Sequence, residues 1–213
     1  MKNSIKNLFA TALTLFVLTT SAFAATDVKE NNVTILSSLK NINKIEVKGN
    51  VELILVQAPA ESVKVYDSYY AKNALVQQQD GVLRISSFEK ETLTVAVYVR
   101  NLSTIEAGGN VHVKTFGKIS FLSLDVKLHG NATADINATT ISLTTNVKDS
   151  ASLNLSGSTA NHYAMLSSQA KLNMEDFITE ASSINSIAPV YAQVKSVKQT
   201  LKSIAIEPLD LAK

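Results

Sequence analysis

The stretch Asn131-Ala-Thr-Ala-Asp-Ile136 begins with a turn-forming residue and then alternates apolar and polar side chains. The same arrangement follows four other positions, which recur at intervals of 19 to 21 residues: Asn110, Ser150, Gln169 and Pro189. Alternation with a period of two predicts a β-strand that has one buried and one exposed face. Its return at a nearly constant interval is typical of architectures built from stacked repeats.

The side chains expected to point inward lie one, three and five residues after each turn, and they are apolar at every position except Thr115. The side chains between them are expected to face solvent. From the unit that begins at Asn131 onward they form two outward columns. The first column contains Thr133, Ser152, Lys171 and Tyr191, and the second contains Asp135, Asn154, Asn173 and Gln193.

Glycine-asparagine pairs occupy three of the predicted corners, because glycine tolerates positive φ and asparagine tolerates left-handed geometry. We expect these residues to have a structural role: Gly49, Asn50, Gly109, Asn110, Gly130 and Asn131. Between the first and second of these pairs the repeat is poorly kept. Strand candidates there include 63–66, 82–86 and 93–99, with Asp80-Gly81 as a hairpin-type corner.

These patterns predict an all-β fold, a mostly parallel β-solenoid with repeats of about 20 residues. This prediction is compatible with antiparallel strands in the N-terminal part. We expect a single domain at 42–206, preceded by a flexible lead-in at 25–41 and followed by a tail at 207–213. The segment 194–206 also fits a short amphipathic helix, although a strand is favoured.

The first 24 residues have the features of a secretory signal peptide. Lys2 and Lys6 precede an apolar run at 8–18, and Ala22-Phe23-Ala24 provides small residues at a cleavage site near Ala24/Ala25. The predicted location is therefore extracytoplasmic: periplasmic, secreted or at the cell surface. The mature chain contains no transmembrane segment, since no later apolar run approaches about 18 residues.

Charge and cysteine content exclude several classes of protein. Without the leader the chain has 18 basic and 18 acidic residues, so it lacks the basic field of a nucleic-acid-binding protein. It contains no cysteine, which excludes a disulfide scaffold, a thiol enzyme, a cysteine-ligated metal site and a lipid-anchored lipoprotein. No cofactor is predicted.

The three histidines are the first candidates for a metal or acid–base site. His112 and His129 flank neighbouring corners, and Glu106 or Asp135 would have to supply a carboxylate. No recognised ligand spacing is present, so no metal site is predicted. His162 is expected to be partly buried and hydrogen-bonded, since it takes the place of a leucine in earlier units.

An enzyme acting on carbohydrate is the main alternative, because glycoside cleavage needs two carboxylates on one face. In the outward column Asp135 is followed by Asn154 and Asn173, so no second carboxylate is expected to stack with it. Asp125, Asp135 and the histidines would be the residues to test if cleavage were found. No catalytic residue is predicted.

Three stretches combine the apolar–polar alternation with glycine corners: Ile45-Glu-Val-Lys-Gly-Asn-Val-Glu-Leu-Ile-Leu-Val-Gln57, Asp80-Gly-Val-Leu-Arg-Ile85, and Val97-Tyr-Val-Arg-Asn-Leu-Ser-Thr-Ile-Glu-Ala-Gly-Gly-Asn-Val-His-Val113. They resemble the exported bacterial proteins described as putative autotransporter adhesins with a head GIN domain. Arg100-Asn101 stands where proline is common in that family, and the late corners lack its usual Gly-Ser-Gly. The resemblance implies a right-handed parallel β-solenoid without catalytic residues.

The outward columns are the candidate binding surface, because polar ladders suit hydrogen bonding to a sugar or a protein. The partner would be a cell-surface glycan or an envelope protein, and the sequence leaves the oligomeric state open. We therefore expect an exported, non-catalytic protein with a binding, adhesion or envelope-scaffolding role. The alternatives are a polysaccharide lyase or glycosidase on the same fold, and a purely structural envelope protein.

Overall fold

A computed structural model describes residues 32–37, 39–67, 74–167, 169–187 and 191–193. The predicted signal peptide, the segment 194–206 and the tail 207–213 lie outside these residues. Within the described ranges the regular structure is entirely strand. In chain order the strands are β1 (Asn32–Leu36), β2 (Lys44–Gly49), β3 (Val51–Gln57), β4 (Ser62–Asp67), β5 (Ala74–Gln79), β6 (Val82–Ser87), β7 (Leu93–Val99), β8 (Thr104–Gly109), β9 (His112–Thr115), β10 (Ile119–Gly130), β11 (Thr133–Val147), β12 (Ser152–Leu166), β13 (Lys171–Ser186) and β14 (Tyr191–Gln193).

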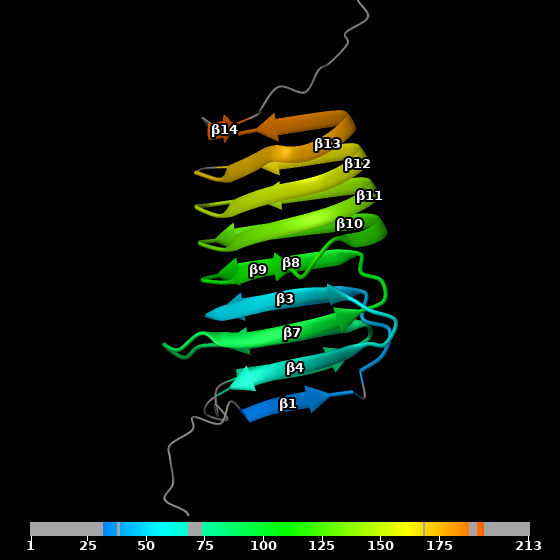
Figure 1. The fold of residues 1–213 in the computed structure, drawn as a ribbon. Coiled ribbons are helices and arrows are strands. Elements are labelled where there is room, and N and C mark those ends of the chain that lie inside the picture. The colour runs from blue at the N-terminus through cyan, green and yellow to red at the C-terminus, as the bar shows by residue number, and fades with distance from the viewer. Residues whose placement is uncertain (1–31, 38, 68–73, 168, 188–190, 194–213) are drawn as a thin grey trace, which may run out of the picture. The chain divides into compact units, whose positions relative to one another are not determined.

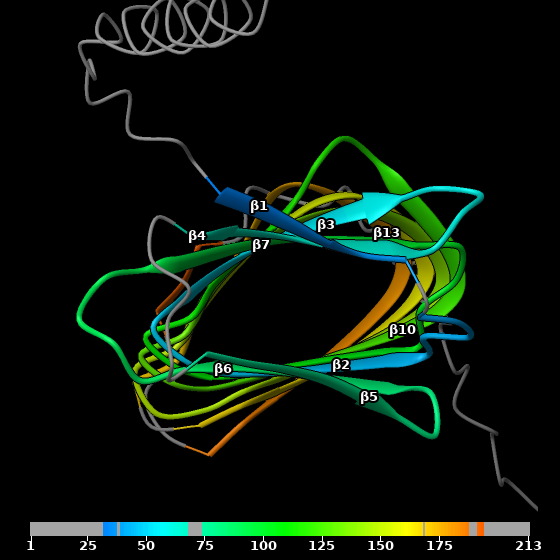
Figure 2. The same ribbon diagram turned by 90° about the horizontal axis from the view of Figure 1, so that it is seen from below.

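All the strands belong to one 14-stranded sheet, which curls so that its two sides face each other (Figure 2). One path through the sheet runs β1-β4-β7-β3-β9-β11-β10-β8-β2-β6-β5, and β12, β13 and β14 continue from β11. Strands β3, β4 and β7 lie on one side, and β2, β5 and β6 on the other (Figure 2). The apolar core lies between them and joins residues of both sides, such as Ile45 and Leu53.

The sheet is mixed, so the prediction of a right-handed parallel β-solenoid is wrong. β4 is antiparallel to β1 and to β7, and β5 is antiparallel to β6. The other described pairs, among them β10 with β11 and β11 with β12, are parallel. The all-β class and antiparallel strands in the N-terminal half agree with the sequence analysis.

Strand order also departs from a simple sequential stack. β2 lies between β6 and β8, and β3 lies between β7 and β9, so the later strands β6 and β7 sit on the outer side of the earlier pair. Figure 1 shows the same order, with β3 between β7 and β9. Alternation of buried and exposed side chains is the same for parallel and antiparallel strands, and this is why it did not reveal direction or order.

The C-terminal half is more regular, because β10 to β13 are long strands stacked in chain order (Figure 1). Ala134 pairs with Leu153, and Leu153 pairs with Leu172. All three side chains are at most 2% exposed, so equivalent apolar residues form a continuous buried column. Burying such a column is the main contribution to the stability of this half.

Three glycines lie at the corners where the sequence analysis placed them, and each has a positive φ: Gly49 (93°), Gly109 (87°) and Gly130 (71°). A Cβ at Gly49 would lie 1.9 Å from the Ser87 carbonyl oxygen. Asn50 donates from Nδ2 to the Lys90 carbonyl oxygen at 2.9 Å, and so holds the corner against the neighbouring loop.

The range 25–41, interpreted from sequence as a flexible lead-in, contains strand β1 (Asn32–Leu36). β1 pairs along its whole length with β4. Val33 and Ile35 are 43% and 59% exposed, so apolar side chains of this strand face solvent. The sequence therefore lacks the usual pattern of a half-buried strand, in which the exposed side chains are polar.

Candidate functional site

The two outward columns predicted from sequence are in register in the structure. Thr133 pairs with Ser152, which pairs with Lys171, which pairs with Tyr191. Asp135, Asn154, Asn173 and Gln193 are aligned in the same way. Because neighbouring strands lie about 4.8 Å apart, each column presents one polar side chain per strand at that spacing from β11 to β13.

Both columns extend further toward the N-terminus than the sequence analysis proposed. Thr133 pairs with His112 and Asp135 with Lys114, and His112 in turn pairs with Glu52. Glu52 and His112 are 60 residues apart in the chain, and the strands between them do not keep the repeat. Only the tertiary pairing of β3 with β9 shows that these residues belong to one surface.

Hydrogen bonds connect neighbouring strands along this surface. His112 Nδ1 lies 2.7 Å from Thr133 Oγ1, and His112 Nε2 lies 3.5 Å from Asp135 Oδ2. Asn154 donates from Nδ2 to Asp135 Oδ1 at 2.6 Å. Asp135 is therefore held from two sides, by one residue on each adjacent strand.

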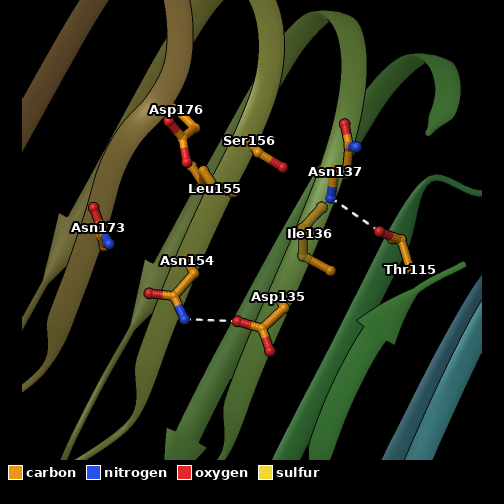
Figure 3. Close-up of a pocket in the computed structure, with 9 residues that line it drawn as sticks. All are labelled: Thr115, Asp135, Ile136, Asn137, Asn154, Leu155, Ser156, Asn173 and Asp176. Atoms are coloured by element: carbon orange, nitrogen blue, oxygen red, sulfur yellow. Dashed lines mark hydrogen bonds between the residues drawn. The ribbon is translucent and has the colours of Figure 1, made fainter. Parts of the chain in front are cut away.

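Three residues of the second column, Asp135, Asn154 and Asn173, line an open cavity of about 280 Å³, which we call the polar groove (Figure 3). Strands β11, β12 and β13 provide most of its lining, and β9 contributes one residue. The lining residues are Thr115, Asp135, Ile136, Asn137, Asn154, Leu155, Ser156, Asn173 and Asp176. Ile136 and Leu155 are buried core residues, so the groups accessible to a ligand are mainly carboxylates, amides and hydroxyls.

Asp176 reaches the groove because of an irregularity in strand pairing. Asn154 pairs with Asn173, but two residues later Ser156 pairs with Asp176, so β13 contains one extra residue at this point. Such a bulge redirects the side chains that follow it. The sequence analysis missed Asp176, Asn137 and Ser156. The signal that could have revealed Asp176 is the change in the spacing between β12 and β13, from 19 residues before the bulge to 20 after it.

The groove carries two carboxylates and no basic side chain. Lys114, which lies opposite Asp135 on the neighbouring strand β9, has its ammonium group paired with Glu52. Lys114 lowers the pKa of the Glu52 carboxyl, chiefly through this hydrogen bond, and Thr94 Oγ1 adds a further bond at 3.3 Å. The Lys114–Glu52 ion pair is therefore neutral overall and does not offset the charge of the groove carboxylates, so the groove is acidic.

The remaining metal and acid–base candidates have separate partners. The His129 ring covers Gly108, where an added Cβ would lie 1.8 Å from its Cε1 atom. Glu106 pairs with Lys44 at 3.0 Å. In the described part of the chain, no three histidine, cysteine, aspartate or glutamate side chains are grouped closely enough to hold a metal ion.

His162 is buried, as expected from sequence, and only 3% exposed. Its Nε2 atom lies 3.1 Å from Thr145 Oγ1, and its Nδ1 atom lies 3.2 Å from Ser182 Oγ. Burial lowers the pKa of His162 to about 4, so the imidazole is neutral at neutral pH. This histidine is a core residue and does not reach the groove.

The other side of the sheet carries a network of ion pairs. Glu46 binds Lys44 at 2.7 Å and Arg84 at 3.1 Å, and Lys44 also binds Glu106. Hydrogen bonds from Glu46 and Glu106 raise the pKa of Lys44, and Lys44 in turn lowers that of Glu46. These charges neutralise one another, so this face is a weaker candidate for ligand binding than the groove.

A family model described as "Putative auto-transporter adhesin, head GIN domain" matches residues 41–205. No curated protein matches the sequence. Among solved structures, a putative adhesin from Bacteroides fragilis NCTC 9343 is similar with a TM-score of 0.61 and 14% identity, over 76% of this chain and 77% of that one. A putative lipid binding protein from Parabacteroides distasonis ATCC 8503 is similar with a TM-score of 0.58 and 8% identity, over 73% and 78%. At these identities the two structures show a shared fold.

Within the described residues, no helix has the length and apolar character needed to cross a membrane.

Proposed function

The chain belongs to the family of putative auto-transporter adhesins with a head GIN domain, and on this basis we propose that it is an exported, non-catalytic binding protein. Its ligand is a cell-surface glycan or an envelope protein, and its binding surface is the polar groove with the two outward columns beside it. The family description favours adhesion over catalysis.

The observation that carries this proposal is the in-register polar surface across β9, β11, β12 and β13, hollowed at the groove. Small-molecule sites are concave and place a few polar groups at fixed positions. Here the hydrogen bonds around Asp135 fix part of that arrangement before any ligand arrives. Preorganisation of this kind reduces the entropic cost of binding.

The test is retention of residues 25–213 on immobilised bacterial and host polysaccharides and on envelope protein fractions, with glycan chain length followed by mass spectrometry. Vesicles of phosphatidylglycerol form a further arm, since one structurally similar protein is described as lipid binding. Retention without shortening supports the proposal. Absence of retention in every arm would contradict it and favour a purely structural envelope role.

A carbohydrate-active enzyme is the second candidate, because Asp135 and Asp176 both line the groove. Glycoside hydrolysis uses two carboxylates on either side of the scissile bond. Shortened glycan products would establish this activity. Loss of cleavage in Asp135→Asn or Asp176→Asn would then identify the carboxylates that perform it.

A further inference from the structure

We infer that the polar groove recognises an uncharged, hydroxyl-rich saccharide unit. This inference rests on the proposed binding function and specifies its ligand. It follows from three properties of the groove: its mixture of hydrogen-bond donors and acceptors, its charge and its size.

The groove offers donors and acceptors whose capacity the protein does not use. Asn154 donates a hydrogen bond from Nδ2 to Asp135, and Asn173 accepts one from the Glu175 backbone N–H at 3.0 Å through Oδ1. Among the described residues, the Ser156 hydroxyl, the Asn137 side-chain amide and the Asp176 carboxylate have no protein partner. Carboxylates only accept, whereas amides and hydroxyls both donate and accept.

A sugar hydroxyl also donates and accepts, so neighbouring hydroxyls of one ring match this mixture. A ligand that displaces ordered water must reproduce the hydrogen bonds of that water. A hydroxyl-rich ring does so at an amide–carboxylate pair such as Asn154 and Asp135. An apolar ligand would leave these groups without partners, at a cost of about 1–3 kcal/mol for each group that becomes buried.

Charge excludes acidic glycans. Asp135 and Asp176 line the groove and no lysine or arginine does. A uronic acid or sulfated sugar in the groove would bring a like charge to these carboxylates, and no lining cation would offset it, since Lys171 belongs to the first column and does not line the groove. Lys114 cannot serve this purpose while it is paired with Glu52. Most of the polar lining side chains are uncharged, which favours a neutral ligand over a strongly cationic one.

The size fits a small part of a glycan. A volume of about 280 Å³ is just below the range of small-molecule sites, which cover roughly 300–1,000 Å³. The site therefore suits a short segment or a chain end. The columns continue onto β9 at His112 and Lys114, so a longer glycan lying across them would meet further polar groups.

The experiment measures binding of short neutral, acidic and amino-bearing oligosaccharides to residues 25–213 by calorimetry. The groove variants are Asn154→Ala and Asp176→Ala. Their matched controls are Asn161→Ala on the same β12 strand and Glu180→Ala on the same β13 strand, both exposed and outside the groove. All four positions are solvent-exposed or nearly so, so folding should survive, as circular dichroism would verify.

We expect neutral oligosaccharides to bind, with Kd raised on the order of tenfold in each groove variant and unchanged in each control. Preference for acidic or amino-bearing sugars would overturn the inference, as would equal affinities in the groove and control variants. If every sugar fails but an envelope protein is retained, this inference fails while the proposed binding function stands. If nothing is retained, both fail.

Discussion

The N-terminal and C-terminal halves of the sheet satisfy their outward polar groups differently. In the N-terminal half, Glu46, Lys44 and Arg84 form a closed ion-pair network, and Glu52 is paired with Lys114. In the C-terminal half the outward side chains are mostly amides and hydroxyls, and several have no protein partner within the described residues. The first arrangement is complete by itself, whereas the second retains hydrogen-bonding capacity for a ligand.

The two halves also differ in how far their contacts reach along the chain. Strands β10 to β13 pair with residues about one repeat away, as in Leu143 with His162. In the N-terminal half, Ile45 pairs with Leu83 and with Ile105. The local half is therefore regular enough to build a periodic surface, and the non-local half depends on contacts that no short-range pattern encodes.

The largest effect is expected from a charge in the buried column. Leu153→Asp places a carboxylate at a position that is 0% exposed, and should cost more than about 4 kcal/mol of unfolding free energy. Circular dichroism and thermal melting would measure it. Leu122→Asp is the control, because Leu122 is 71% exposed and the same change there should have little effect. Unchanged melting in Leu153→Asp would show that the core assignment is mistaken.

A second comparison concerns the glycines that permit close approach of strands. Gly49→Ala and Gly157→Ala place a Cβ 1.9 Å from Ser87 O and 2.1 Å from Ala138 O, at φ values of 93° and 100°. Each should cost more than the roughly 1–2 kcal/mol of the positive φ alone, because backbone must also move. Gly117→Ala is the control, since its φ is 76° and no atom lies within 4 Å.

Chemical denaturation of these three variants would test whether the two halves tolerate backbone displacement equally. A similar loss at Gly49 and Gly157 would mean that both halves are packed with the same precision. A cost at Gly117 equal to the other two would contradict the role assigned to the close contacts.

A smaller, pH-dependent effect is expected at His162. Its pKa is lowered from 6.5 to about 4 by burial, so the unfolded state binds more protons between these values. The contribution of the neutral histidine is fully present above pH 6.5 and is lost as the pH falls toward 4. Melting temperature should therefore decrease over this window.

His162→Leu should flatten that dependence, because leucine occupies the equivalent positions Leu124 and Leu143 on the two preceding strands. Melting curves at pH 7, 5.5 and 4.5 would make the comparison. Parallel losses of melting temperature in the wild type and the variant would mean that another group causes the acid sensitivity.

The smallest effect is expected from the ion pairs of the N-terminal half. Glu46→Gln removes one partner from both Lys44 and Arg84, and should cost about 0.5 kcal/mol, since surface pairs contribute little. The loss should shrink as salt is raised. Glu175→Gln, at an exposed position of β13, is the matched control. A loss of several kcal/mol for Glu46→Gln would mean that this network holds the half together.

Much of the C-terminal half could be predicted from the sequence. The spacing that placed Asp135, Asn154 and Asn173 in one column agrees with the observed pairing. The burial of His162 was expected for the same reason. The same repeat placed His112 on the outward face, in agreement with its pairing to Thr133. The extension of the surface to Glu52 was not expected, because an irregular segment separates β3 from β9 in the chain.

Part of the groove also escaped prediction. One extra residue in β13 places Asp176 opposite Ser156, and a single-residue shift reverses which side chains share a face. The sequence analysis carried a uniform register through this point and found no second carboxylate near Asp135. The position of the bulge depends on how β12 and β13 pack.

By itself the sequence determined the all-β class, the positions of the strands in the C-terminal half, the inward and outward faces, and the glycine corners. These are local properties, since the direction of a side chain along a strand and the φ of a corner depend on a few consecutive residues. The tertiary structure alone decided the mixed strand directions, the order β6-β2-β8 and β7-β3-β9, and the groove that joins Asp135 to Asp176. These depend on which distant strands pair, and alternation with a period of two is the same whichever partner a strand finds.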